Sequence, residues 1–62
     1  MKFKDVAIGQ VFFEDQTGEY YIKVSDTDSQ VYDINEDHVH IVGTEPITCI
    51  FPQDHEIDEI FK

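Results

Sequence analysis

Two histidines two residues apart are the first side chains in this sequence whose spacing suggests chemistry. His38 and His40 fall on an expected strand, so both imidazoles should point to one face, about 6.7 Å apart along it. With the neighbouring carboxylates of Glu36 and Asp37 they could contribute to a zinc site. Two imidazoles and one carboxylate do not complete a structural zinc site. We therefore predict a solvated histidine pair, with no bound metal or other cofactor.

Calcium binding and nucleophilic catalysis are also weakly indicated. The run Asp26–Gln30 has the form of the start of a calcium-binding loop, but Val31 stands where that loop requires glycine, so a solvated turn is favoured. Cys49 beside a histidine would be the one thiol–imidazole pair. It lies in the apolar run 47–51, where a buried and inert thiol is expected. We predict no catalytic residue and no enzymatic activity.

The dominant chemical feature is an excess of carboxylates. The chain has 62 residues with 14 acidic side chains, four lysines and no arginine, and a formal net charge of −10 at pH 7. Three lysines lie near the chain ends, so the body between Asp5 and Phe61 holds 14 acids and one lysine, a net −13. Such a surface repels nucleic acid and membrane phosphates and attracts basic proteins. One cysteine excludes an internal disulfide, and no apolar run approaches the roughly 18 residues of a membrane span, so a cytoplasmic protein is expected.

Three explanations of this acidity stay open: a functional acidic surface, solubility, and adaptation to high salt. The five phenylalanines and three tyrosines argue against the last. If the acidity is functional, two groups of carboxylates should contact a partner, one on a loop–strand–loop unit and one on a hairpin. These candidate partner-binding residues are Asp26, Asp28, Asp33, Glu36 and Asp37 in the first group, and Glu14, Asp15 and Glu19 in the second.

Alternating apolar residues and closely spaced turn signals predict an all-β fold. Five short strands are expected, at 11–13, 19–24, 30–34, 38–42 and 47–51. They should form one domain over residues 1–51, a small five-stranded antiparallel barrel or strongly curved sheet of SH3-like size. Residues 52–62 form an acidic C-terminal segment, in which the spacing of Ile57, Ile60 and Phe61 predicts a short helix packed on the sheet. Without that packing the segment would fray.

Two aromatic residues are candidate anchors for a partner. The second strand is expected to direct Tyr20, Ile22 and Val24 inward, which leaves Tyr21 on the outer face. Phe12 has the equivalent position on the first strand. Exposed aromatic side chains surrounded by acids are suited to binding a basic protein. In a sheet this small, both rings could equally be partly buried.

The first 26 residues resemble a pattern in short bacteriophage proteins of unassigned function. The stretch Phe3–Phe12 has the form Phe-x-Asp-hydrophobic-x-hydrophobic-Gly-x-x-Phe, and Tyr20–Asp26 is an aromatic strand that continues as lysine and a hydrophobic residue. The resemblance implies a phage or mobile-element origin and brings no catalytic residue with it. The acid excess and small size separately resemble phage-encoded DNA-mimic inhibitors, which share no single fold.

The sequence thus favours a non-enzymatic, phage-encoded acidic protein that inhibits a basic nucleic-acid-binding host protein by presenting a DNA-like negative surface. The expected target is a nuclease, polymerase or DNA-repair protein in the host cytoplasm, with no direct contact to nucleic acid or membrane. The alternative is a structural or accessory interaction module, which uses the apolar C-terminal stripe or an edge strand while the charge serves solubility alone. Either protein could act as a monomer or as a homodimer.

Overall fold

The computed structural model describes all 62 residues, and its regular secondary structure is almost entirely short β-strands, which confirms the all-β prediction. One 3₁₀ turn, η1 (Phe3–Asp5), precedes the strands. The strands are β1 (Val11–Glu14), β2 (Glu19–Lys23), β3 (Asp28–Asp33), β4 (His38–Val39), β5 (Ile41–Val42), β6 (Glu45–Pro46), β7 (Thr48–Ile50) and β8 (Glu59–Ile60). No helix in the structure has the length and apolarity needed to cross a bilayer.

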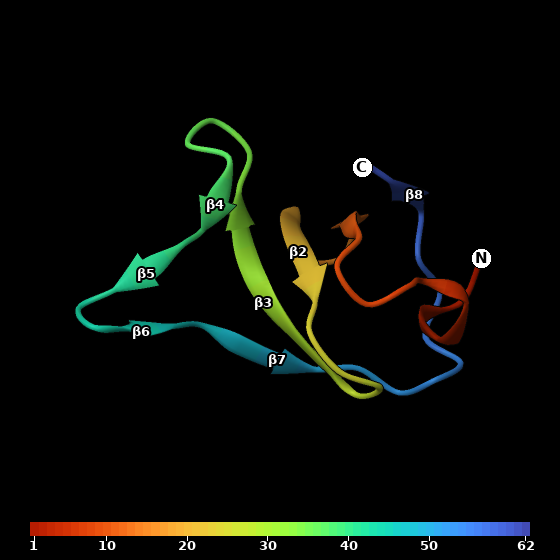
Figure 1. Ribbon diagram of the computed structural model, residues 1–62. Helices are drawn as coiled ribbons and strands as arrows, with labels where there is room; N and C mark the ends of the chain where they lie inside the picture. Colours follow the sequence, from red (N-terminus) through yellow and green to blue (C-terminus); the bar gives the residue numbers. More distant parts are fainter.

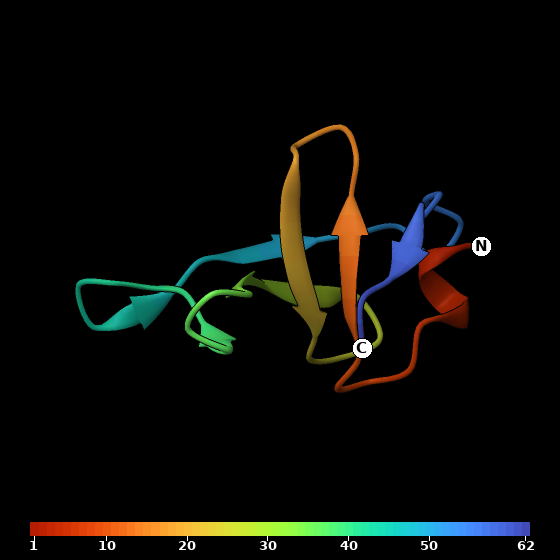
Figure 2. The ribbon, with the colours of Figure 1, turned by 90° about the horizontal axis from the view of Figure 1, so that it is seen from above.

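The strands form an open, curved antiparallel sheet rather than a closed five-stranded barrel. β4, β3, β2, β1 and β8 lie side by side in that order, and β7 pairs with the edge of β3 that β4 also uses. The remaining two strands, β5 and β6, form a separate hairpin. From above, β1 and β2 cross β3 and β7 steeply, so the sheet bends around its core (Figures 1 and 2).

The first hairpin has the position that its turn signal predicts. β1 and β2 pair with Phe12 opposite Tyr21 and Glu14 opposite Glu19. The turn between them ends at Gly18, whose φ of 70° lies in the left-handed region that glycine adopts without steric cost. The strands expected at 11–13, 19–24 and 30–34 are confirmed, with small shifts at their ends.

The fourth expected strand, 38–42, is divided at His40 into β4 and β5. The chain then turns through Gly43, with a φ of 70°, into β6. Both views show this β5–β6 hairpin extending away from the rest of the molecule (Figures 1 and 2). Ile41 and Val42 are consequently 48% and 59% exposed.

The core is a cluster of aromatic and aliphatic side chains from distant parts of the chain. Phe12 and Tyr21 stack with ring centroids 5.8 Å apart, and Phe3 meets Phe12 edge-on at 5.9 Å. The ring of Phe51 contacts all three of these rings. Ile57, from the C-terminal segment, packs in the same cluster, so the two ends of the chain close the core together.

The C-terminal segment is extended, and the short helix expected there is wrong. Ile60 pairs with Phe12 and Glu59 with Phe13, which makes β8 the edge strand beside β1. Ile57 is only 2% exposed. A helix of about two turns has little stability of its own, so backbone pairing with β1 and burial of Ile57 outweigh the helical spacing.

The second strand faces the opposite way from the expectation. Phe12 and Tyr21 are 0% and 3% exposed, so neither is an exposed anchor. As a cross-strand pair they point into the core together, and Lys23, two residues after Tyr21, must also point inward. The Lys23 ammonium is accommodated because it donates hydrogen bonds to the carbonyls of Phe3 at 2.9 Å and Val6 at 2.8 Å.

Candidate functional site

Glu14, expected on the partner-binding surface, is buried. The alternation of β1 directs its side chain to the same side as Phe12, and the residue is 2% exposed. One carboxylate oxygen accepts a hydrogen bond from the Gln16 amide at 2.5 Å, and the other contacts Nε2 of His55. Glu14 therefore joins the β1–β2 turn to the C-terminal segment and is unavailable to a partner.

The contacts of Glu14 favour its ionised form. Burial by itself raises the pKa of this carboxyl, but the hydrogen bonds from His55 and the Gln16 amide outweigh burial. The charge of a protonated His55 acts in the same direction. The pKa of Glu14 consequently lies below its ordinary value.

The Glu14→Gln variant should be less stable than the wild-type protein by about 1–3 kcal/mol at neutral pH, because the amide loses the charge that strengthens these hydrogen bonds. The folded-state pKa is lowered, so the stabilisation is fully present above the ordinary value of 4.5 and is lost as pH falls through the folded-state pKa. Urea unfolding between neutral and acidic pH should show the two proteins converging below about pH 4.5.

Glu19→Gln is the matched control, because Glu19 lies opposite Glu14 in the hairpin and is exposed. This variant should stay close to the wild-type stability throughout the same pH range. A Glu14→Gln deficit that persists unchanged into strong acid would contradict the assignment.

Exposed carboxylates from three parts of the sequence gather along the C-terminal segment. The amide of Asp15, in the β1–β2 turn, donates to Oδ2 of Asp58 at 3.0 Å. Asp15 and Asp58 line a surface hollow of about 380 Å³, and Asp54 lines it too. None of the residues that line this hollow is hydrophobic. Gln53 Nε2 donates to the carbonyl of Asp26 at 2.6 Å and so brings the β2–β3 turn beside this segment. We call Asp15, Asp26, Asp54 and Asp58 the acidic band.

No member of the acidic band has a cationic partner. The three ion pairs of the structure join the terminal amino group to Glu56, His55 to Glu14, and Lys62 to Asp37. Lys23 is buried. The carboxylates of the band are therefore exposed and uncompensated by ion pairing.

The other predicted carboxylates do not form a single cluster. Asp28 begins β3 and Asp33 ends it, so the strand separates them by about 16 Å. Oδ1 of Asp33 accepts hydrogen bonds from the amides of Asn35 at 2.9 Å and Glu36 at 3.1 Å, which fix the β3–β4 turn. The expected loop–strand–loop group is thus split between the two ends of β3.

The negative charge of Asp37 is compensated by a lysine of the same chain. It has a φ of 58°, unusual for a residue other than glycine, and its carboxylate accepts hydrogen bonds from the Lys62 ammonium and from the Tyr32 hydroxyl, the latter at 2.7 Å. These two bonds hold the pKa of Asp37 below its usual range. The same ion pair raises the pKa of Lys62. Lys62 therefore contacts an acid of the body of the domain, although it lies at the end of the chain.

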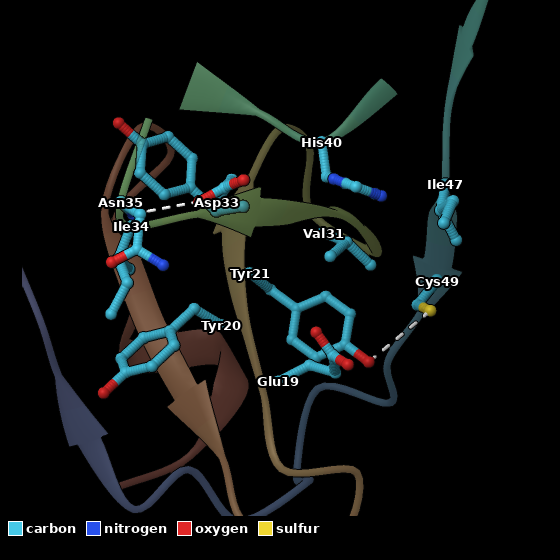
Figure 3. A pocket seen from close by; sticks show the side chains of 11 residues that line it. Glu19, Tyr20, Tyr21, Val31, Asp33, Ile34, Asn35, His40, Ile47 and Cys49 are labelled. Carbon is cyan, nitrogen blue, oxygen red and sulfur yellow. Dashed lines mark hydrogen bonds between the residues drawn. The ribbon is translucent and has the colours of Figure 1, made fainter. Parts of the chain in front are cut away.

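A larger open hollow of about 620 Å³ lies over β2, β3 and β7 (Figure 3). This hollow is an open surface groove and not an enclosed pocket. Burial raises the pKa of Tyr21 on its floor, and the nearby charge of Glu19 adds to the shift. The residues that line it are Glu19, Tyr20, Tyr21, Val31, Tyr32, Asp33, Ile34, Asn35, His40, Ile47 and Cys49.

Cys49 and His40 both line this larger hollow without forming a pair. The Cys49 thiol lies 3.9 Å from the hydroxyl of Tyr21, and no hydrogen bond joins it to His40. Nucleophilic catalysis by a thiol requires such contact with a base. Nδ1 of His38 contacts the carbonyl of Val39 at 2.7 Å, and no three His, Cys, Asp or Glu side chains are arranged to hold a metal ion.

Sequence reasoning missed the aromatic residues that are accessible. On the outer face, Tyr20 lies 5.0 Å from Phe13 and 5.2 Å from Phe61 between ring centroids, and Phe61 is 47% exposed. It also missed Asp54 and Asp58 as members of a surface cluster. The accessible aromatic residues and the acidic cluster were missed for the same reason. Both depend on the segment 57–61, which pairs with β1 as a strand and was expected to be a helix.

The fold and these surfaces define a small all-β protein with an uncompensated acidic band and a partly apolar groove. Comparison of the chain with protein families, with characterised proteins and with solved structures finds no match.

Proposed function

We propose that this protein is a non-enzymatic acidic binding protein that inhibits a basic, nucleic-acid-binding protein by presenting a DNA-like negative surface. The observation that carries the proposal is the acidic band along the C-terminal segment. Asp15, Asp54 and Asp58 line one hollow there, the turn that holds Asp26 lies beside Gln53, and none of these acids has a cationic partner. Basic nucleases, polymerases and DNA-repair proteins have surfaces complementary to such a band.

The density of charge supports this choice of partner. The longest dimension of the molecule is 31 Å. Duplex DNA of that length carries about 18 phosphate charges. The protein carries 14 carboxylates and a net charge of −10 over a similar length. A surface that binds DNA through phosphate contacts would therefore experience a field of comparable magnitude.

The proposal predicts binding that depends steeply on salt. The tagged protein should capture basic nucleic-acid-binding proteins from a bacterial lysate at low salt, and about tenfold less of them at 0.5 M NaCl. Added duplex DNA should compete for the same captured proteins. The double variant Asp15→Asn/Asp54→Asn should reduce their capture about fivefold, because each exposed ion pair contributes up to about 1 kcal/mol.

Glu45→Gln/Glu59→Gln is the matched control. Both residues are exposed and lie outside the band, and their substitution gives the same net charge as Asp15→Asn/Asp54→Asn. This variant should retain capture. Capture that is unchanged between low and high salt, or equally reduced in both double variants, would contradict recognition by the acidic band.

The second candidate function is an accessory interaction module with apolar contacts. This alternative rested on the C-terminal stripe or on an edge strand, and burial of Ile57 takes one of the three stripe residues out of reach of a partner. The exposed Ile41 and Val42 of the projecting β5–β6 hairpin now favour it instead. Ile41→Ser/Val42→Ser should abolish partner capture if this alternative holds, and Asp15→Asn/Asp54→Asn should then have no effect.

A further inference from the structure

The larger hollow differs from the acidic band because it combines an apolar floor with carboxylates. Tyr21 is 3% exposed, and Val31 and Cys49 pack against the core. In Figure 3 the Glu19 carboxylate lies beside the Tyr21 ring, and Asp33 lies on the neighbouring strand β3. The volume of about 620 Å³ is in the range of small-ligand and side-chain sites.

The two carboxylates of the hollow are available to a ligand. The Glu19 carboxylate accepts no hydrogen bond within the protein, and the three ion pairs use other acids. Asp33 uses only Oδ1 in the β3–β4 turn, which leaves Oδ2 free. No lysine lines the hollow. Its charge therefore favours a cationic group.

Aromatic rings beside these carboxylates narrow the choice of cation. Three tyrosines line the hollow, and the ring of Tyr21 is the one that lies beside the Glu19 carboxylate (Figure 3). A guanidinium can stack on such a ring while it donates hydrogen bonds to carboxylates. The protein itself uses this kind of contact: the Lys23 ammonium lies 4.3 Å from the centroid of the Phe3 ring, and the Lys62 ammonium lies 5.5 Å from that of Tyr32. Lys62 therefore already occupies the Tyr32 ring, and Tyr21 is the ring left for a ligand. An arginine matches this combination better than the more strongly hydrated lysine.

Other occupants fit the hollow less well. A second copy of this chain would bring another net charge of −10 to the same surface, and a phosphate would meet the same repulsion. A metal ion would need ligands that are not assembled here. A side chain that is both cationic and flanked by apolar surface matches the floor and the charges together.

We propose that the larger hollow binds an arginine, flanked by an apolar residue, in a peptide segment of the partner. The guanidinium pairs with Glu19 and Asp33, and the apolar neighbour covers Val31 and Cys49. The origin of the peptide rests on the proposed function, because a basic nucleic-acid-binding protein is the source of the arginine.

A peptide titration of the isotope-labelled full-length protein tests this assignment. The probe is the blocked peptide Ac-Ile-Arg-Leu-NH₂, compared with Ac-Ile-Gln-Leu-NH₂, which lacks the cation, and with Ac-Arg-NH₂, which lacks the apolar neighbours. Amide shifts should concentrate at Tyr21, Val31 and Cys49, and the arginine tripeptide should bind about tenfold more tightly than either comparison. Equal binding of the glutamine peptide, or shifts confined to the acidic band, would overturn the proposal.

Two double variants with the same net charge separate the hollow from the general field. Glu19→Gln/Asp33→Asn should weaken peptide binding about tenfold, while an asparagine oxygen still accepts the turn hydrogen bonds at position 33. Glu45→Gln/Glu59→Gln should change it by less than about twofold. Unchanged binding in the first variant overturns the hollow alone, since the proposed function is judged separately by salt-dependent capture through Asp15 and Asp54.

Discussion

We expect the Ile57→Ala variant to be largely unfolded at room temperature. Ile57 is 2% exposed and packs in one cluster with Phe3, Phe12 and Phe51. Truncation of a buried isoleucine to alanine costs about 2–5 kcal/mol. A core of this size rarely supplies more than about 3–5 kcal/mol in total, so little or no stability should remain. Circular dichroism and urea unfolding measure the loss directly.

Two further isoleucine variants make the result quantitative. Ile57→Val removes one methylene and should cost about 0.5–1.5 kcal/mol, which leaves a folded protein whose loss can be measured. Ile50→Ala makes the same chemical change at a residue that is 76% exposed, and should stay within about 0.5 kcal/mol of the wild-type protein. Equal losses at positions 57 and 50 would show that the C-terminal segment is not part of the core.

This expectation also affects how partner binding is studied. Deletion of residues 52–62 would remove Ile57 and the β8 pairing with β1. A loss of binding after that deletion would then follow from unfolding and would say nothing about an apolar binding stripe. Surface substitutions such as Asp15→Asn, which touch no core contact, are the appropriate probes.

Local signals were sufficient to predict the strands of the first half of the chain. The turn that ends at Gly18 and the alternation after it place β1 and β2 correctly, because a hairpin depends on residues close in sequence. Alternation does not say which side of a strand is buried. Counting apolar residues favoured Ile22 and Val24 over Lys23, and the choice was wrong because Lys23 finds two carbonyl acceptors.

Contacts between distant segments could not be predicted in this way. The spacing of Ile57, Ile60 and Phe61 is compatible both with a helix and with an extended segment that pairs with β1. Only the presence of the partner strand β1 decides between the two structures. The acidic band depends on the same pairing, because Asp58 reaches Asp15 only when this segment is extended. The sequence therefore indicated an acidic protein but could not locate the surface on which the carboxylates gather.

The burial of Lys23 is the feature furthest from sequence expectation, and it has a structural consequence. Its residue exposure is 4%, and its ammonium donates to the carbonyls of Phe3 and Val6 while lying over the Phe3 ring. The carbonyl of Phe3 also accepts from the Val6 amide at 3.1 Å, whereas that of Val6 has Lys23 as its partner. The Lys23 ammonium thus joins β2 to η1 through these hydrogen bonds.

The Lys23→Met variant should lose about 1–3 kcal/mol of unfolding free energy. Removing a buried ammonium relieves its dehydration, which works against this loss. Methionine retains most of the stem but offers no donor, so the Val6 carbonyl is left buried and unpaired, at a cost of about 1–3 kcal/mol. The variant also forfeits the attraction between a buried cation and an acidic body, and its net charge becomes more negative than −10. The unpaired carbonyl and the lost attraction together should outweigh the relieved dehydration of the ammonium. Urea unfolding measures the resulting change in the free energy of unfolding.

Lys4→Met is the matched control, since Lys4 is exposed and the substitution changes the net charge equally. It should cost less than about 0.5 kcal/mol. Hydrogen exchange adds a local readout, because the amides of Asp5 and Val6 bond within η1 and should exchange faster only when Lys23 is replaced. If Lys23→Met proves as stable as Lys4→Met with η1 still protected, dehydration of the ammonium offsets its hydrogen bonds, and Phe3 alone holds η1 against the sheet.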